Sequence, residues 1–343
     1  MRLDEFNYPL PVAAIAQEPT GDRSSARMLV DVAGQIEHLR VRDLPNILEQ
    51  GDLLVLNDTR VLAARLPARR ASGGMSEVLF LHPTGSGPST WEVLVRPSRK
   101  IPPGSVLTID DQVSVYVHDD LGDGRRIVEV EAPDGVVDTL ERYGQMPLPP
   151  YLSTTLDDPE RYQTVYSCRS ASAAAPTAGL HFTDEVLERC RAAGARIEKL
   201  ELVVGLDTFR PVVVEDLDQH QMHSEAYTVP ETTLNACADA KRVVAVGTTT
   251  TRALEAAVRT GPSGRTDLFI RRPFDFRVVD LLLTNFHLPR TTLLAMLDAF
   301  MGPTWQDRYA LALAEGYRFL SFGDAMLVDR ETAGGNGLGG SSR

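Results

Sequence analysis

The chain has 343 residues, of which 43% are hydrophobic and 24% are charged, so its composition is that of a globular protein and excludes wholesale disorder. Its formal net charge is −12 at pH 7. Proteins that coat nucleic acids nonspecifically are normally basic, so this charge argues against that class. It does not exclude an enzyme that binds RNA on a local basic face. The length is typical of about two domains.

The cysteines and the apolar segments indicate the compartment. Cys168, Cys190 and Cys237 are widely spaced and form no C-x-x-C motif, which argues against a disulfide scaffold and a thiolate zinc site. The first residues lack the apolar core of a signal peptide. No apolar stretch approaches the roughly 18–20 residues that span a bilayer. We therefore expect a cytoplasmic protein that does not enter a membrane.

The opening segment contains one strongly apolar run, at residues 53–56, which predicts a buried strand after a turn signal at residues 51–52. Polar side chains follow directly at the carboxyl end of this strand. Ligands bind at that edge of open α/β sheets. The candidate residues are Asn57, Asp58, Thr59 and Arg60.

Residues 69–133 have a different character. Their short β-rich runs are separated by glycine and proline and lie at residues 77–81, 91–95, 106–109, 113–117 and 127–130. Val113, Val115 and Val117 alternate with polar residues, which is the period of a half-buried strand. Several strands without an intervening helix predict a small barrel or sandwich. We expect it to be inserted into a larger domain, because an α/β pattern resumes after it.

The rest of the chain alternates helices and strands. Hydrophobic periodicity predicts helices at residues 184–193, 231–242, 249–259, 291–301 and 305–315. Apolar runs predict strands at residues 197–204, 243–246, 268–270, 278–283 and 319–322. This alternation predicts a largely parallel or mixed sheet that helices cover. Residues 331–343 are rich in glycine and serine and predict a flexible tail.

The first segment that is suited to chemistry is residues 174–183. Its small residues let a backbone approach a ligand closely, Gly179 permits a positive φ, and Thr177 stands nearby. His181 can exchange a proton near neutral pH. The alternative interpretation of His181 is a hydrogen-bonded structural histidine.

The second such segment, residues 246–252, lies between a predicted strand and a predicted helix. Free amides and hydroxyls at a helix N-terminus, with an arginine nearby, suit a carboxylate or a phosphate. Plain N-capping by threonine is an equally good interpretation. The segment has no Gly-Lys-Ser/Thr, so it is not a nucleotide-binding P-loop. The candidates are Thr248, Thr249, Thr250, Thr251 and Arg252.

Two later segments offer an amide, an imidazole and a carboxylate. Asn285 and His287 occupy alternate positions near the end of a predicted strand, so both side chains are expected on one face. Asp324 follows the last predicted strand and offers a carboxylate at a strand end, unless it is a plain turn residue.

One further segment resembles a set of metal ligands. It holds His220, His223 and Glu225, but it lacks the helical H-E-x-x-H arrangement and has no cysteine close by. We therefore expect no metal.

These segments resemble those of one family, the S-adenosylmethionine:tRNA ribosyltransferase-isomerases of queuosine biosynthesis. The matches occur in the family's order over about residues 1–328. They are GDLLVLNDTRV at 51–61, MPLPPY at 146–151, RYQTVY at 161–166, APTAGLHF at 175–182, MHSE at 222–225, GTT at 247–249, TNFHLP at 284–289 and GDAM at 323–326. The match at 175–182 is far more specific than a lone glycine motif.

The resemblance implies a fold, namely an α/β mixed-sheet domain interrupted by a small inserted all-β barrel domain. The discontinuous α/β catalytic domain is expected at residues 1–66 and 148–330, and the barrel at residues 67–147. The resemblance also implies the reaction. The ribosyl moiety of S-adenosylmethionine is transferred to 7-aminomethyl-7-deazaguanine in the wobble position of the tRNA anticodon and isomerised, which gives epoxyqueuosine, adenine and methionine. We expect S-adenosylmethionine as cosubstrate, this tRNA as partner, and a monomer.

This chemistry assigns hypothetical catalytic roles. A base must remove a proton from the 5′ carbon beside the sulfonium, and a neutral imidazole has suitable basicity. His181 is our first candidate and His287 our second. The leaving adenine needs a proton, for which Asp58, Asp324 or the second histidine is the candidate.

Binding roles follow in the same way. Thr248 to Thr251 with Arg252 are predicted to hold the methionine carboxylate. Asn57, Arg60 and Asn285 are predicted to hold ribose or base edges, and Thr177 and Gly179 to line the site. Basic residues of the β-rich insert are predicted to bind tRNA phosphates, a solvated face being the alternative. These are Arg96, Arg99, Lys100, Arg125 and Arg126.

Four positions depart from the family pattern. Val203 stands where the family has histidine, Asp207 where it has glycine, Gln221 where a basic residue is expected, and Pro273 in place of the glycine of a Gly-Tyr-x-Phe segment. One alternative is therefore a paralogue that donates the ribosyl group to another acceptor, including a small molecule. Another is an RNA-binding module without activity. No G-x-G-x-x-G follows a strand, which argues against a dinucleotide oxidoreductase.

Overall fold

The computed structural model describes residues 1–85, 87–153, 156–205, 212 and 214–331, and the chain forms two compact units. The first unit comprises Met1–Thr59, Tyr151–Arg169 and Ala175–Arg343, and the second comprises Arg60–Pro150 and Ser170–Ala174. The expected boundaries of independent domains, at residues 66/67 and 147/148, stay a prediction. Asp207 and all but the first residue of the expected tail lie outside the described residues.

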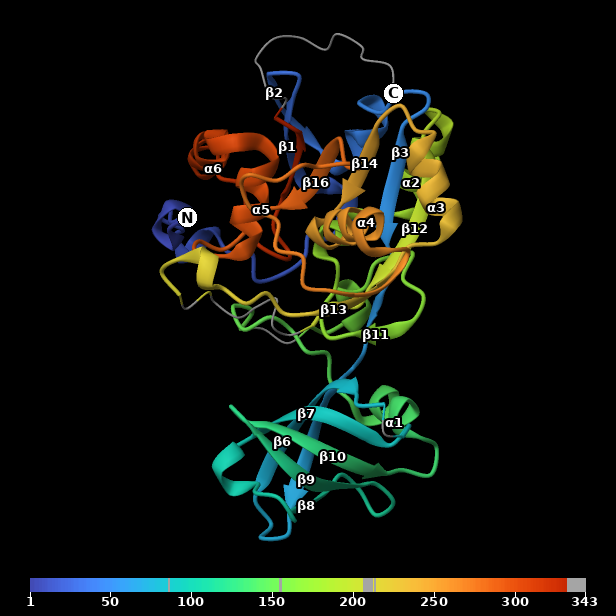
Figure 1. Cartoon of the computed structure of the whole chain (residues 1–343), viewed down its shortest axis with the longest axis vertical. Helices are drawn as coiled ribbons and strands as arrows, with labels where there is room; N and C mark the ends of the chain where they lie inside the picture. Colours follow the sequence, from blue (N-terminus) through green and yellow to red (C-terminus); the bar gives the residue numbers. More distant parts are fainter. Residues whose placement is uncertain (86, 154–155, 206–211, 213, 332–343) are drawn as a thin grey trace. The chain divides into compact units, whose positions relative to one another are not determined.

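Within the described residues, the first unit is built on a nine-stranded mixed sheet (Figure 1). In the order of the sheet, its strands are β15 (Ser263–Thr266), β13 (Glu225–Thr228), β12 (Arg196–Leu202), β3 (Leu53–Asn57), β14 (Val243–Val246), β16 (Leu281–Asn285), β17 (Ala325–Asp329), β1 (Arg27–Val32) and β2 (Gln35–Arg40). The neighbours β12, β3, β14 and β16 are parallel, whereas β17 is antiparallel to β16. The predicted α/β mixed sheet is confirmed.

The central strands are continuous apolar runs because helices and loops cover both of their faces. Every residue of β3, β14 and β16 is buried. Leu54, Val244 and Leu283 belong to one hydrophobic cluster that joins the three strands. This core fixes the register of the strands, so the polar residues that follow them meet at one edge of the sheet.

Five α-helices of the first unit are described. They are α2 (Asp184–Ala192), α3 (Glu231–Ala238), α4 (Thr248–Thr260), α5 (Thr292–Met301) and α6 (Trp305–Ala314). Helix α4 packs on β12, β3 and β14. The helix predicted at 231–242 ends early, because Lys241 and Arg242 leave it to bind Glu49 and Asp52. Across the described ranges, no helix is both long and apolar enough to cross a membrane.

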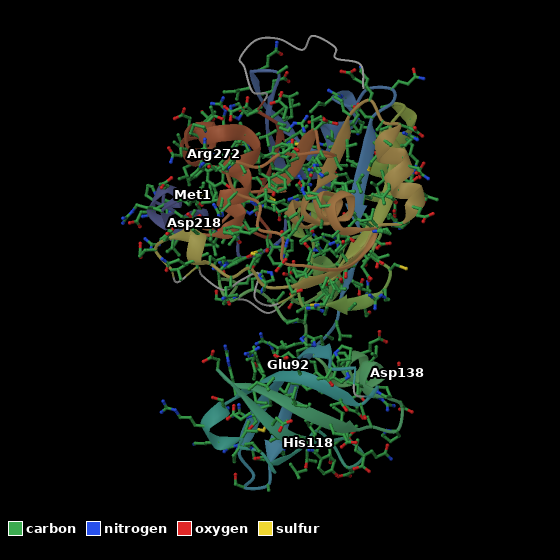
Figure 2. All side chains as sticks on the ribbon, viewed as in Figure 1. Met1, Glu92, His118, Asp138, Asp218 and Arg272 are labelled. Carbon is green, nitrogen blue, oxygen red and sulfur yellow. The ribbon has the colours of Figure 1, made fainter. Side chains whose placement is uncertain are left out.

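Short 3-10 helices connect these elements. They are η1 (Leu3–Phe6), η2 (Val12–Ala14), η3 (Arg23–Ser25), η4 (Val41–Asn46), η6 (Pro159–Tyr162), η7 (Thr177–His181), η9 (Leu217–Gln219) and η10 (Gly302–Thr304). The N-terminus is anchored on η9, since the amino group of Met1 lies 3.7 Å from Oδ2 of Asp218 (Figure 2).

Two predicted strands are wrong. Residues 268–270 form no strand, and the carbonyl of Leu268 instead accepts a hydrogen bond from Arg252 Nε. Residues 319–322 form a turn in which Leu320 has a φ of +70°, a conformation that a strand excludes. The last strand, β17, lies after this turn, so Asp324 precedes the final strand rather than following it.

The second unit contains a closed antiparallel barrel, as predicted (Figure 1). Its strands in order are β10 (Arg125–Glu131), β7 (Thr90–Arg96), β6 (Met75–Pro83), β5 (Arg65–Arg70), β8 (Val106–Thr108) and β9 (Ser114–Gly122). Val78, Val93 and Val115 are fully buried in it. The unit also holds α1 (Val136–Tyr143), η5 (Ser98–Lys100) and the pair β11 (Ser170–Ser172) and β4 (Arg60–Val61).

Candidate active site

The carboxyl ends of β3, β14 and β16 lie at one edge of the sheet, and Asn57 ties two of its segments together. The amide nitrogen of Asn57 donates to the carbonyl of Leu202 at 3.0 Å and to Oγ1 of Thr249 at 3.2 Å. Its amide oxygen accepts from the backbone N–H groups of Thr59 and Leu202. Asn57 is completely buried. In this conformation its hydrogen bonds connect β3, β12 and α4, and none is left for a ligand.

Asn285 joins the end of β16 to η7. Its amide oxygen accepts from Oγ1 of Thr177 at 2.9 Å. Its amide nitrogen faces Nε2 of His181 at 3.1 Å and the carbonyl oxygen of Asp324 at 3.4 Å. A carbonyl oxygen only accepts, so the atom that faces it must be the amide nitrogen. Nε2 of His181 is therefore an acceptor, and the neutral ring carries its proton on Nδ1.

The surroundings of His181 favour this neutral form. The side chain is only 4% exposed. Burial, together with the smaller effects of the positive charges of Arg318 and Arg23, lowers the pKa of His181 to about 4. Both causes penalise the imidazolium form. At neutral pH the imidazole is therefore uncharged.

Two glycines let η7 pack closely on its neighbours. A Cβ on Gly179 would lie 2.0 Å from Oη of Tyr166, so only glycine fits there. Gly247 has a φ of +93°, and a Cβ built on it would lie 3.6 Å from Cβ of Ala178. The turn before α4 thus contacts the segment that carries His181. Segments 177–181, 247–249 and 285, distant in the sequence, share one edge of the sheet.

A cavity of about 420 Å³, open to solvent, lies at the start of α4. Thr248 and Thr249, in the first turn of the helix, line it and are partly exposed. Phe269, Leu293 and Met296 give it apolar walls. The cavity therefore combines polar groups at a helix N-terminus with an apolar surface, which is typical of small-molecule sites.

The rest of the predicted carboxylate site is used by the protein itself. The buried hydroxyls of Thr250 and Thr251 donate to the carbonyls of Val246 and Gly247. Arg252 is 3% exposed, and its guanidinium donates to Glu225 and to three backbone carbonyls. In this conformation only the first two threonines of the run have surface to offer a ligand.

Glu225 is a buried carboxylate in the wall of the cavity. Burial by itself raises the pKa of Glu225, but a hydrogen bond from His223 and the charge of Arg252 outweigh this effect and lower the pKa below its usual value. Nε2 of His223 lies 3.4 Å from Oε1 of Glu225. The described residues contain no group of three or more His, Cys, Asp or Glu side chains that could hold a metal ion.

Asp58 and Asp324 differ in their hydrogen bonds. Both carboxylate oxygens of Asp324 accept backbone N–H bonds, from Arg27 and Arg318, at 2.8 Å each. Asp58 is half-buried, and burial raises its pKa, a shift that Glu201 reinforces and Lys199 opposes.

His287 is placed differently from His181. Burial lowers the pKa of His287 to about 3, and its Nε2 lies 3.1 Å from Oγ1 of Thr284. It lines neither the cavity at the start of α4 nor the smaller cavity beside His181. Its backbone N–H donates to Oη of Tyr309 at 2.9 Å.

A second cavity, of about 240 Å³, opens beside His181. We name it the arginine pocket; Arg23, Arg161, His181 and Ser321 line it, and Arg318 donates to the carbonyl of its lining residue Phe322. The hydroxyl of Ser321 is bonded to Oη of Tyr151 at 2.6 Å. The sequence analysis did not single out these arginines.

Comparison with known proteins identifies the family. A family model described as queuosine biosynthesis protein matches residues 3–328. The chain belongs to this family. A relative from Azoarcus sp. (strain BH72), named S-adenosylmethionine:tRNA ribosyltransferase-isomerase, is 49% identical over 343 residues, covering 96% of this chain and 98% of the relative. A relative of the same name from Staphylococcus saprophyticus is 45% identical, covering 96% and 100%.

A solved structure supports the same family. The crystal structure of S-adenosylmethionine tRNA ribosyltransferase from Thermotoga maritima has a TM-score of 0.54 and 35% sequence identity to this chain. The likeness covers 94% of this chain and 99% of that chain. The resemblance that the motifs indicated is thus confirmed over nearly the whole length.

Among the remaining candidates for this family's site, Arg60 begins β4 in the second unit. Of the departures from the family pattern, Val203 donates its N–H to the carbonyl of Ala226, and Gln221 and Pro273 are exposed. On the barrel, Arg96, Arg99 and Lys100 are exposed. Arg125 pairs with Glu92, and Arg126 is buried against Asp120, so Arg126 is unavailable to a phosphate.

Proposed function

We propose that this chain transfers and isomerises the ribosyl moiety of S-adenosylmethionine onto 7-aminomethyl-7-deazaguanine in the wobble position of tRNA, which gives epoxyqueuosine, adenine and methionine. Membership of the queuosine biosynthesis family and the names of the relatives support this activity. The observation that carries the site is the hydrogen-bonded junction of Thr177, His181 and Asn285 at the edge where β3, β14 and β16 end.

S-adenosylmethionine is proposed to occupy the cavity at the start of α4. The partly exposed Thr248 and Thr249, with the free amides of the first turn, suit the methionine carboxylate. The apolar walls at Phe269 and Met296 suit the nucleoside.

His181 is proposed as the base that removes the proton from the 5′ carbon of the cosubstrate. Its pKa of about 4 keeps it neutral at physiological pH, so it accepts a proton without first losing one. Its Nε2 accepts from Asn285, so the bound cosubstrate must displace this amide. The displaced Asn285 amide then contacts a ribose edge. The same displacement thus frees His181 to act as the base and Asn285 to bind the cosubstrate. His287 remains the second candidate.

Asp58 is proposed as the acid that protonates the leaving adenine. A carboxyl group whose pKa is raised holds its proton longer, which favours proton donation. Asp324, whose two carboxylate oxygens already accept backbone N–H groups, is the weaker candidate.

The proposal is tested by mass spectrometry of tRNA after incubation with the enzyme and S-adenosylmethionine. Epoxyqueuosine should form in tRNA that carries the deazaguanine, with one adenine released per modified tRNA. His181→Ala should reduce turnover about a hundredfold or more. The matched control is His38→Ala, an exposed histidine bonded to Tyr317. Adenine release with the free deazapurine but not with tRNA would instead support the paralogue.

The enzyme is also proposed to bind tRNA phosphates through exposed cations of the barrel, Arg96, Arg99 and Lys100. We further propose a cytoplasmic monomer. Light scattering after size exclusion tests the oligomeric state, and the mass of a dimer would contradict this proposal.

A further inference from the structure

The arginine pocket contains positive charge that forms no ion pair with a carboxylate among the described residues. Arg23 donates only to the backbone carbonyls of Gln163, Leu180 and Glu160. Two nearby arginines behave alike: Arg161 also lines the pocket, and Arg318 donates to the carbonyl of the lining residue Phe322. Arg161 donates to the carbonyls of residues 20 and 21, and Arg318 to those of residues 18 and 322.

Donors remain free on these side chains. A guanidinium has five N–H donors, and Arg161 and Arg318 each use two of them. Nε of Arg161 is buried and donates to no acceptor among the described residues. A buried donor without a partner costs free energy unless a ligand completes it.

The charges around the pocket point the same way. Burial lowers the pKa of Arg23, and repulsion from Arg161 lowers it further. The attraction of Asp158 and Glu160 opposes this shift only in part. Within the described part of the chain, no carboxylate oxygen lies within 4.0 Å of the guanidinium groups of Arg23, Arg161 or Arg318. Most other described arginines of the first unit have a carboxylate at such a distance, for example Arg252 and Arg272. These guanidinium groups thus have no carboxylate partner among the described residues.

We propose that the arginine pocket binds a phosphodiester group of the RNA substrate and holds it beside His181. Planar guanidinium groups bind phosphate oxygens in bidentate fashion. His181 lines the same pocket, so a phosphate bound there positions the RNA next to the proposed base. This inference rests on the proposed function, because that function brings RNA to this edge of the sheet.

The methionine carboxylate of the cosubstrate is the other source of an oxyanion. Like a phosphodiester, it brings one negative charge, so charge alone does not distinguish the two ligands. The carboxylate also has a proposed site at Thr248 and Thr249. The observations therefore favour the phosphodiester.

The test measures binding of tRNA that carries the deazaguanine, by fluorescence anisotropy without S-adenosylmethionine, over a series of KCl concentrations. Arg161→Gln should weaken the affinity about tenfold to a hundredfold. It should also make the negative slope of log affinity against log salt shallower by about 0.7–0.9. Arg161→Lys keeps the charge but loses the fork, so its slope should stay near that of the wild type while its affinity falls.

Arg189→Gln is the matched control, since this arginine is exposed, donates only to the carbonyl of Arg42 and lies outside the pocket. Its tRNA affinity should change less than twofold. The KM for S-adenosylmethionine at saturating tRNA should stay within twofold in all variants. If circular dichroism shows that Arg161→Gln does not fold, Arg318→Gln replaces it. Arg318→Gln is expected to have the same effect on tRNA binding.

Two results would overturn the inference. One is an unchanged tRNA affinity and salt slope in the glutamine variants. The other is a raised KM for S-adenosylmethionine with unchanged tRNA affinity, which would assign the pocket to the methionine carboxylate. Failure of the proposed function is distinguishable, because wild-type protein would then release no adenine, while the binding measurement needs no catalysis.

Discussion

Replacing Gly179 by alanine tests whether close packing against Tyr166 holds the turn that carries His181. The new Cβ would lie 2.0 Å from Oη of Tyr166 and 2.9 Å from Cγ2 of Thr164. Tyr166 is 8% exposed and part of the core cluster, so moving its ring disturbs the packing around it. Either η7 or the ring must shift, and both movements disturb the position of His181.

The magnitude follows from the size of this overlap. Inserting a methyl group into a packed core costs about 1–3 kcal/mol, and a contact of 2.0 Å places Gly179→Ala at the upper end. Activity should fall together with stability, because His181 lies two residues further along the same turn. We expect kcat to fall about tenfold or more, since misplacement by about 1 Å can cost a hundredfold.

Tyr166→Phe offers a matched relief variant. The hydroxyl of Tyr166 is buried and has no hydrogen-bond partner among the described residues, so its removal alone should be nearly neutral. In the double variant with Gly179→Ala, the nearest ring atom would lie 3.0 Å from the new Cβ, which is still tight but no longer impossible. We expect a favourable coupling energy of about 1 kcal/mol and partial recovery of kcat.

The assay is urea denaturation of the four proteins of this cycle, together with adenine release. Additive free energies of unfolding, with no coupling between residues 179 and 166, would refute the packing argument. So would a Gly179→Ala variant that keeps wild-type stability. Loss of activity without loss of stability would show that Gly179 touches substrate directly.

Three further predictions concern His181, Arg252 and the threonine run. The pKa of His181 is lowered to about 4 from its usual 6.5, so the free energy of unfolding is fully present above about pH 6.5 and falls by about 3 kcal/mol as pH drops toward 4. His181→Gln should remove this part of the fall in urea titrations at pH 4.5 and 7, and equal pH slopes would contradict it. Arg252→Met leaves a buried carboxylate unpaired and should cost about 3–5 kcal/mol, measured by the same titration; a loss below 1 kcal/mol would show that the pair is dispensable. Thr249→Val should raise the KM for S-adenosylmethionine severalfold while Thr250→Val leaves it unchanged, because Thr249 lines the cavity and Thr250 does not; equal effects would count against the proposed carboxylate position.

Local patterns predicted much of the fold. The apolar runs of β3 and β14 and the period of α4 were readable because each depends on burial of one segment. The turn at residues 319–322 was not readable, since its apolar side chains are buried as in a strand while the positive φ of Leu320 leaves no signature in a leucine. Strand β5 was missed because Pro67 and several arginines interrupt its alternation.

The candidate site was predictable where residues stand at strand ends. Asn285 and His181 could be chosen by residue type and position, and they form a direct contact. Residue type does not show whether a polar group is already used by the protein, so Asn57 and Arg252 looked available. The arginine pocket escaped because its side chains come from distant segments and only the fold assembles them.

We expect occupation of the arginine pocket to change the basicity of His181, which lines it. Burial, Arg318 and Arg23 lower its pKa to about 4, which makes the imidazole a weak base in the free enzyme. A phosphate bound in the arginine pocket would cancel part of the repulsion from these arginines and raise the pKa toward its usual value. His181 then becomes a stronger base only when RNA is in place, which suppresses loss of the 5′ proton from cosubstrate bound alone. The apparent acidic pKa in the pH profile of kcat, which reports the complex, should accordingly exceed that of kcat/KM for tRNA, which reports the enzyme without RNA. Arg161→Gln should reduce this difference.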